Sequence, residues 1–245
     1  MSEKARIISL VPSWTETLLE AGVLVVGCTQ FCIHPIDKIS SISKVGGTKN
    51  MNLEKILQLK PDFVILDEQE NKLEMAEELK RNHISLLISN VTDLQSVEDF
   101  LITLGEALSN EKLIQMAGRY QKLNLQKINK EKFWQQIFIL GERLTSQSPV
   151  DYVIWRKPFM VIGKNTFIAE NLKFGGIELI REEKYPKVSE ADLKKSFCLF
   201  SSEPYPFAKH FDSLKQRGMH GALVDGEKLS WYGIRNLNFL ERCLE

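Results

Sequence analysis

The fold prediction starts from one stretch of sequence, NEKLIQMAGRYQKLNLQKINK, which runs from Asn110 to Lys130. Its apolar residues recur every three to five positions, mostly on one helical face, and Ser109 or Asn110 can cap its start. About twenty residues of helix span roughly 30 Å, the width of a small domain. We therefore expect one long helix that joins two lobes and limits their motion, because a single apolar stripe must pack on a lobe to be stable.

Strand-like and helix-like segments alternate on both sides of this stretch. We place the N-terminal lobe at residues 1–108, the linking helix at 109–130 and the C-terminal lobe at 131–245. The strands expected in the first lobe include Arg6–Val11 and Asp62–Leu66, and the second lobe starts with a strand expected at Trp134–Leu140. Alternation of this kind predicts an α/β fold with a mostly parallel sheet in each lobe, and we expect the ligand in a cleft between the lobes.

Composition excludes several classes of protein. The chain has 245 residues, 43% hydrophobic and 26% charged, and its 32 basic side chains balance 32 acidic ones. A net charge of zero argues against a nucleic-acid-binding protein. No stretch is long enough to span a membrane, so an integral membrane protein is not expected, and we expect a monomer.

The beginning of the sequence and the cysteines lead to an expectation about location. MSEKARIISL passes from a charged start directly into a strand-like run, with no apolar segment of a secretory signal. Cys28, Cys32, Cys198 and Cys243 have no framework spacing. We therefore expect a cytoplasmic protein with reduced thiols, or a periplasmic or lipid-anchored one if the true start lies upstream.

Ligands of open α/β sheets bind outside the carboxyl ends of the strands, so the loops that follow the strands are the candidate site. These loops are rich in aromatic residues, proline and glycine, and contain few groups suited to attack a substrate. They are Pro12–Trp14, Phe31–Pro35, Asp67–Asn71, Trp155–Phe159, Ser201–Tyr205 and Asp225–Tyr232.

Three motifs allow a chemical interpretation, and each has a simpler one that we favour. Cys28, Cys32 and His34 could bind a metal ion, but CxxxCxH lacks the paired spacing of a zinc site. Ser201-Ser202 with His210 or His220 could form a hydrolase, but no GxSxG elbow surrounds the serines. Gly46-Gly47 could approach a phosphate, yet no phosphate-binding pattern surrounds it, so a turn is expected.

Two further features leave alternatives open. Glu68, Glu70, Glu74, Glu77 and Glu78 form an acidic run, either a solvated helix face or a docking surface for a basic partner. Trp155 and Trp231 either belong to the core or line a cleft for a flat apolar ligand.

Several motifs resemble the helical-backbone metal-receptor superfamily, the substrate-binding proteins of cobalamin and ferric-siderophore ABC importers. They begin with IISLVPSWTE at Ile7–Glu16 and continue with MNLEKI at Met51–Ile56 and KPDFVI at Lys60–Ile65. The cobalamin-binding branch also shares the order of four later pairs, Gly163-Lys164, Gly175-Gly176, Tyr185-Pro186 and Val188-Ser189. The resemblance implies two α/β lobes bridged by one helix.

The resemblance also implies which residues line the ligand site. Pro12, Phe31, Trp155, Phe159 and Asp225 fall where the cobalamin-binding branch lines its cleft. Phe31 stands where that branch often has tyrosine, and Thr48 replaces a tryptophan. We also expect Asp225 and Arg235 to be polar anchors for the ligand at the second-lobe edge of the cleft. The complete predicted site is Pro12, Ser13, Trp14, Phe31, Thr48, Trp155, Phe159, Glu203, Asp225, Trp231, Tyr232 and Arg235.

The functional prediction is a non-enzymatic substrate-binding protein for cobalamin, another corrinoid or a related metal chelate. No complete acid–base or nucleophile set is found, so we predict neither catalytic residues nor a required cofactor. The chelate is the expected partner, and an ABC permease is a candidate second partner. The alternatives are a ferric-siderophore or haem-type ligand, and a cytoplasmic enzyme or interaction protein that reuses the fold.

Overall fold

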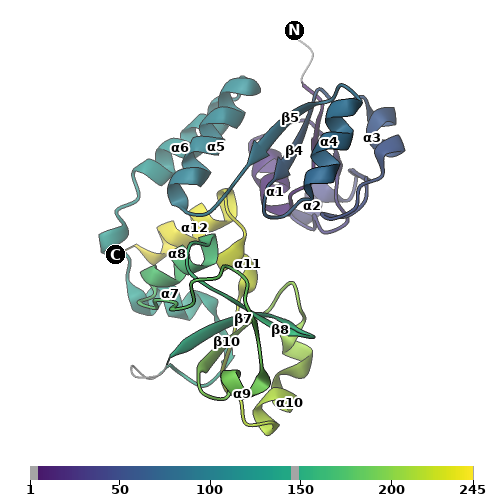
Figure 1. The fold of residues 1–245 in the computed structure, drawn as a ribbon. Helices are drawn as coiled ribbons and strands as arrows, with labels where there is room; N and C mark the ends of the chain where they lie inside the picture. Colours follow the sequence, from purple (N-terminus) through teal and green to yellow (C-terminus); the bar gives the residue numbers. More distant parts are fainter. Residues whose placement is uncertain (1–4, 145–148, 245) are drawn as a thin grey trace. The chain divides into compact units, whose positions relative to one another are not determined.

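The structure is a computed structural model that describes residues 5–144 and 149–244. The chain forms two compact units (Figure 1). One contains Met1–Lys122 and Tyr232–Leu237, and the other contains Leu123–Trp231 and Asn238–Glu245. We call them the first lobe and the second lobe. The lobe boundaries predicted at residues 108 and 131 stay a prediction.

The first lobe contains a five-stranded sheet in which each paired strand is parallel to its neighbours, as the alternating pattern predicted. The strand order is β3-β2-β1-β4-β5. Helices connect successive strands, because a parallel pair needs a long crossover connection. The strands are β1 (Ile7–Ser9), β2 (Val25–Cys28), β3 (Ser43–Lys44), β4 (Phe63–Asp67) and β5 (Ser85–Ser89), and the connecting helices are α1 (Pro12–Glu20), α2 (Ile36–Ile39), α3 (Leu53–Leu59) and α4 (Leu73–Arg81).

Side chains pack on both faces of this sheet. On one face, Ile8, Val64 and Leu66 pack against Ile56 of α3 and Leu79 of α4. Around α1, the buried ring of Trp14 lies 4.9 Å from that of Phe100, which belongs to α5 (Leu94–Ala107). The strands of a parallel sheet covered on both faces are buried and nearly continuously apolar, which is why Ile7-Ile8 reads as a strand in the sequence.

The expected linking helix is not confirmed. Residues Glu111–Gln121 form α6, which runs beside α5 within the first lobe (Figure 1). Its end is closed where the backbone N–H of Lys122 donates to Arg119 and Tyr120 carbonyls. A short 3-10 turn and α7 follow, and the Asn129 side chain accepts from the Lys132 N–H to cap α7. Asparagine favours caps over helix interiors, so an interrupted helix is the better interpretation of this stretch.

The second lobe contains a six-stranded sheet that is mixed, so the prediction of a parallel sheet in this lobe is wrong. The strand order is β6-β11-β10-β7-β8-β9, and β10 is parallel to both β7 and β11 while the other pairs are antiparallel. Lys157-Pro158 alone connects β7 to β8, and two residues can form only a hairpin. The strands are β6 (Phe138–Gly141), β7 (Val150–Arg156), β8 (Phe159–Ile162), β9 (Lys187–Val188), β10 (Phe197–Ser201) and β11 (His220–Val224).

Helices cover both faces of the second sheet. Cys198, Phe200 and Leu223 pack on one face against Phe211 and Leu214 of α10. The segment predicted as a strand at Trp134–Leu140 is mostly α7, because the apolar residues that become buried there are four positions apart, at the helical period. The helices of this region are α7 (Lys130–Ile137), α8 (Phe167–Phe174), α9 (Glu190–Leu193), α10 (Phe211–Gln216), α11 (Gly226–Ser230) and α12 (Ile234–Cys243), with 3-10 turns η1 (Leu125–Lys127) and η2 (Phe207–His210).

Two properties bear on the expectations from composition. Among the described residues, no helix combines the length and apolar character needed to cross a membrane. Cys28, Cys32, Cys198 and Cys243 are all buried free thiols.

The first lobe has a buried polar chain that generates a prediction. The Trp14 indole N–H donates to Ser89 Oγ at 2.8 Å, and this hydroxyl donates to Asp67 Oδ2 at 2.7 Å. All three residues are almost completely buried. Ser89→Ala should lower the free energy of unfolding by about 1–3 kcal/mol, because a buried donor and a carboxylate each lose a partner.

Urea denaturation of the full chain measures this change. Ser85→Ala, an exposed position on the same strand, is the control and should change stability by less than about 0.5 kcal/mol. Equal stabilities of the two variants would contradict the role given to Ser89.

Candidate functional site

The loops at the carboxyl ends of β1, β2, β3 and β4 form one candidate face of the first lobe. The Asn71 side chain holds three of its backbone segments together. Its amide donates to the Leu10 carbonyl at 3.2 Å and to the Thr48 carbonyl at 2.8 Å, while its oxygen accepts from the Asp67 N–H at 2.8 Å. Thr48 thus lies on this face, half-buried, and its backbone rather than its side chain makes the contact.

Phe31 is the most prominent aromatic side chain of this face. It is 51% exposed, which leaves half its surface free for a ligand. A Cβ on Gly47 would lie only 3.2 Å from the Phe31 ring, so glycine lets the backbone approach that ring closely. Ile33 in the same loop and Ile36, which begins α2, are also exposed, at 49% and 76%. The loop after β2 therefore presents an apolar surface.

Four predicted site residues are packed inside the first lobe. Pro12, Ser13 and Trp14 are buried at the start of α1. The Tyr232 ring lies 4.9 Å from that of Trp14, and its hydroxyl is 3.1 Å from Glu70 Oε1, to which it donates. Burial and the Glu70 carboxylate raise the pKa of Tyr232 well above its usual value. Burial argues against direct ligand contact by these side chains. The first turn of α1 follows β1 almost directly and therefore packs in the core of the lobe.

Arg235 also belongs to the first lobe, which corrects its expected place at the second-lobe edge. Its guanidinium donates to both Glu16 oxygens at 2.8 Å. The two side chains are only 20% and 13% exposed, so the pair is largely removed from water. A bidentate contact of this kind fixes both orientation and distance. Arg235 is thus a structural residue rather than a free anchor.

The second lobe presents its aromatic side chains at the end of β7 and after β10. Trp155 is 42% exposed, and its ring meets that of Tyr205 edge-on at 5.6 Å. Tyr205 in turn packs on Phe207 at 4.6 Å. Phe159 lies partly buried against the core of this lobe. Tyr205 belongs to the loop Ser201–Tyr205 that the sequence marks as a candidate, but it is not among the individually predicted site residues.

Polar contacts fix the second-lobe loops that follow β10 and β11. Ser230 Oγ donates to Glu203 Oε1 at 2.6 Å, and the Gly226 N–H donates to Ser202 Oγ at 2.9 Å. Burial, reinforced by neighbouring carboxylates, raises the pKa of Glu203 although Ser230 donates to it.

Asp225 and Trp231 bound the helix between these loops. Asp225 caps α11 by accepting from the Lys228 N–H at 3.2 Å, and its other oxygen lies 3.0 Å from Lys228 Nζ. Trp231 ends α11 and is only 8% exposed. The structure therefore brings Glu203, Asp225 and Trp231 near one another in the second lobe, with Trp155 as the exposed aromatic residue.

The chemical alternatives raised by the sequence have structural explanations. Ser201 is 1% exposed, accepts from the Tyr152 hydroxyl at 3.1 Å and donates to the Glu203 carbonyl at 2.5 Å, so its oxygen is not available to attack a substrate. His210 packs against Tyr205. The Gly46-Gly47 segment is a turn, in which the Gly47 N–H donates to the Asn50 carbonyl at 2.7 Å.

The thiols near His34 are held by other groups. Lys44 Nζ donates to Cys28 Sγ at 3.2 Å, and the hydroxyls of Thr15 and Thr29 lie 3.1 and 3.2 Å from Cys32 Sγ. Burial opposes ionisation of Cys32, but hydrogen bonds from Cys28 and both threonines outweigh it and lower the pKa of Cys32 to about 6. Within residues 5–144 and 149–244, no three His, Cys, Asp or Glu side chains form a metal-binding group.

Comparison with known proteins identifies the family. A family model described as periplasmic binding protein matches residues 7–131, slightly more than half of the chain. The chain belongs to the periplasmic binding protein family. The resemblance inferred from the motifs at Ile7–Glu16 and Met51–Ile65 is thereby confirmed.

Alignments with individual relatives cover more than half of the chain. The vitamin B12-binding protein of Vibrio cholerae is 25% identical over 207 residues, which are 81% of this chain and 70% of that protein. An uncharacterized ABC transporter substrate-binding lipoprotein of Bacillus subtilis is 32% identical over 136 residues, 53% of this chain and 42% of that protein. The proteins that these names describe are binding proteins rather than enzymes.

Solved structures share the fold. The periplasmic vitamin B12 binding protein of V. cholerae has a TM-score of 0.70 at 21% identity, and the match covers 98% of this chain and 94% of that one. The periplasmic heme-binding protein BhuT, solved with two hemes, has a TM-score of 0.76 at 17% identity, with 98% of each chain covered. At these identities the likeness establishes the two-lobed α/β fold, and the mixed second sheet is part of it.

The raised pKa of Glu203 predicts a pH-dependent stability. A carboxyl group whose folded pKa lies above its unfolded value, about 4.3, favours folding below the unfolded value, and this contribution is lost as the pH rises through the folded pKa. Glu203→Gln stays neutral throughout. Its stability relative to the natural protein should therefore increase as the pH rises above about 4.3 and through the folded pKa of Glu203.

Urea denaturation across this pH range measures the difference. Glu183→Gln, at an exposed position of the same lobe, is the control for replacing one carboxyl group by an amide. A pH-independent difference for Glu203→Gln would mean that its folded pKa is not raised.

Proposed function

We propose that this protein is the substrate-binding protein of an ABC importer and binds cobalamin, another corrinoid or a related metal chelate without transforming it. The observation that carries the proposal is the 25% identity to the vitamin B12-binding protein of V. cholerae, which extends over 81% of this chain. Family membership and the shared fold support the same conclusion.

The exposed side chains of the loop faces suit such a ligand. A corrinoid has a broad, mostly apolar ring edged with amide groups. Aromatic side chains bury large apolar areas, and a few polar groups fix the orientation of the ligand. Phe31 in the first lobe and Trp155 with Tyr205 in the second lobe supply aromatic surface. We propose these three as the main ligand contacts, and keep Thr48, Phe159, Glu203 and Asp225 as surrounding residues.

Binding without catalysis is consistent with the chemistry of the loops. Ser201 is engaged in two hydrogen bonds, Asp225 is engaged as a helix cap, and Glu203 accepts from Ser230. None of these three has the nucleophile–base geometry that covalent catalysis needs. We therefore propose that the protein is not an enzyme.

Location and partner follow from the same relatives. Solved structures of the fold are named periplasmic, and the B. subtilis relative is named a lipoprotein. We propose a periplasmic or lipid-anchored location, because the cytoplasmic expectation has no support among these relatives. An ABC permease is the proposed partner.

A haem-type chelate is the second candidate, and one observation favours it. Haem iron takes an axial oxygen, nitrogen or sulfur ligand, and tyrosine is one of the side chains that provides it. Tyr205 is half-exposed beside Trp155 and carries a phenol. Because the loop residues suit both ligands, titration with each ligand is the measurement that distinguishes corrinoid binding from haem binding.

We expect Trp155→Ala to weaken cobalamin binding roughly ten- to a hundredfold, because an aromatic contact of a tight complex is worth about 1.4–2.8 kcal/mol. Titration followed by corrinoid absorbance measures the effect. Phe31→Ala should weaken binding in the same direction.

Tyr185→Ala is the matched control, because Tyr185 is 41% exposed and Trp155 is 42% exposed. Tyr185 lies beside the end of β8, where the Gly163 N–H donates to the Lys184 carbonyl. Trp155 instead pairs with Met160, near the beginning of β8. If cobalamin does not bind at high micromolar concentration, a parallel titration with haem and with Tyr205→Phe decides the second candidate. Absence of both would refute the chelate-binding function.

A further inference from the structure

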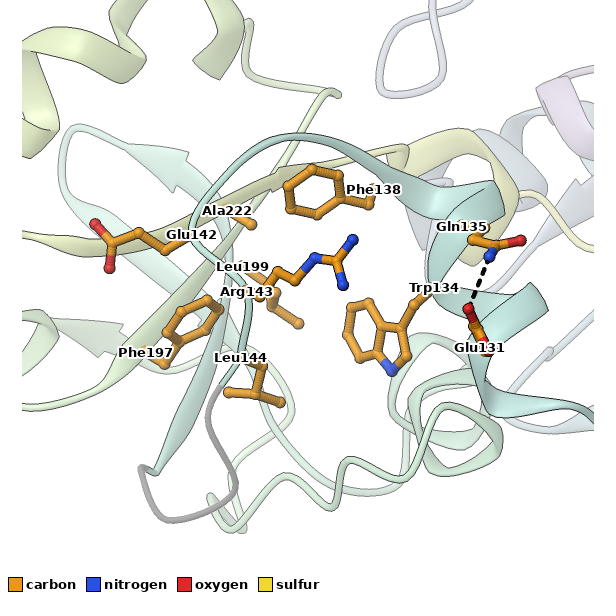
Figure 2. A pocket seen from close by; sticks show the side chains of 10 residues that line it. All are labelled: Glu131, Trp134, Gln135, Phe138, Glu142, Arg143, Leu144, Phe197, Leu199 and Ala222. Carbon is orange, nitrogen blue, oxygen red and sulfur yellow. Dashed lines mark hydrogen bonds between the residues drawn. The ribbon is translucent and has the colours of Figure 1, made fainter.

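The second lobe has a cavity that shares no residue with the loop faces. It has a volume of about 510 Å³ and lies beside α7 and β6 (Figure 2). That volume falls within the range of about 300–1,000 Å³ typical of small-molecule sites. Most of its walls are apolar, and they include Trp134, Phe138, Leu144, Phe197 and Leu199.

The floor of the cavity comes from one face of the second sheet. Leu199 of β10 and Ala222 of β11 are directly paired in the sheet, so their side chains lie on the same face. Cys198 and Leu223 are the next residues along these strands, and they pack on the opposite face in the core. Phe197, at the start of β10, completes the floor. None of the residues that line the cavity belongs to the candidate loops, so the cavity is distinct from the loop faces.

The Trp134 indole is held in place at one wall. Its N–H donates to the Gly175 carbonyl at 2.9 Å, and its ring meets that of Phe133 edge-on at 5.8 Å. A ring fixed by packing and a hydrogen bond needs little ordering when a flat molecule stacks on it. The wall is thus preformed.

Arg143 supplies a positive charge at this cavity. Figure 2 shows its guanidinium pointing into the space between Trp134 and Phe138. Among the described residues, Arg143 has no hydrogen bond or ion pair.

The two carboxylates that line the same cavity are already engaged. Glu131 accepts from Gln135 at 3.1 Å, and Glu142 lies 4.0 Å from Lys215 and 3.6 Å from His220. Neither carboxylate pairs with Arg143 among the described residues, so its guanidinium is left to bind an anionic ligand.

We propose that this cavity binds an amphipathic aromatic anion, a molecule with a flat apolar body and one carboxylate or sulfonate group. The body packs on Trp134, Phe138 and the sheet floor, and the anionic group accepts hydrogen bonds from Arg143. A guanidinium matches a planar carboxylate with two parallel hydrogen bonds, and a sulfonate provides the same pair of acceptors. The proposal is independent of chelate binding.

Two fluorescent probes with similar bodies and different charges test it. Anilinonaphthalene sulfonate carries the anionic group, and phenyl naphthylamine is neutral. Arg143→Met should weaken sulfonate binding about tenfold, which corresponds to about 1.4 kcal/mol, and should change binding of the neutral probe by less than about twofold. Trp134→Leu should weaken both probes.

Arg242→Met is the control, since it removes the same charge from another exposed position of the second lobe and should change neither probe. Thermal unfolding of each variant verifies that it is folded. Unchanged sulfonate binding in Arg143→Met, or no saturable binding to the natural protein, would overturn the proposal. Displacement of the sulfonate by cobalamin would also overturn it, because the probe would then occupy the chelate site.

Discussion

The first lobe depends on an ion pair between residues far apart in the chain, Glu16 near its start and Arg235 near its end. Two hydrogen bonds of 2.8 Å hold the C-terminal segment against α1, where both side chains are largely removed from water. Removing either partner would leave a buried charge uncompensated, which is far more costly than breaking a surface pair. The lobe is therefore complete only when the end of the chain has returned to it.

The contacts around this ion pair explain the local sequence. The Tyr120 hydroxyl donates to the Gly233 carbonyl at 2.7 Å, and the Ile234 N–H donates to Thr17 Oγ1 at 3.1 Å. Gly233 has a φ of 78°, and a Cβ there would lie 2.1 Å from Thr17 Oγ1, so only glycine fits. This packing holds α1 through Glu16 and Thr17 in its second turn, and with it the loop that follows β1, in a fixed position.

The two sheets use their edges differently. In the first lobe each strand pair is parallel, so the loops after β1, β3 and β4 meet at one edge, where Asn71 ties them together. In the second lobe the hairpin β7–β8 and the edge strand β6 make the sheet mixed. Trp155 reaches the loop face from one side of that hairpin, while β6 and α7 leave a separate apolar cavity. One lobe thus offers two chemically different surfaces.

The sequence alone determined the family, the parallel first sheet and the loop positions of Phe31 and Trp155, because motifs, strand–helix alternation and loop composition are local properties. It did not reveal that the stretch Asn110–Lys130 breaks, since Leu123 and Ile128 continue the apolar spacing of α6, while the capping role of Asn129 depends on where the next helix packs. Nor could it separate Trp14, Tyr232 and Arg235 from ligand-binding residues, because burial is a property of the assembled lobe. Tertiary structure decided these cases: a side chain at a strand end is free or buried according to whether a distant segment, here Tyr232–Leu237, packs over it.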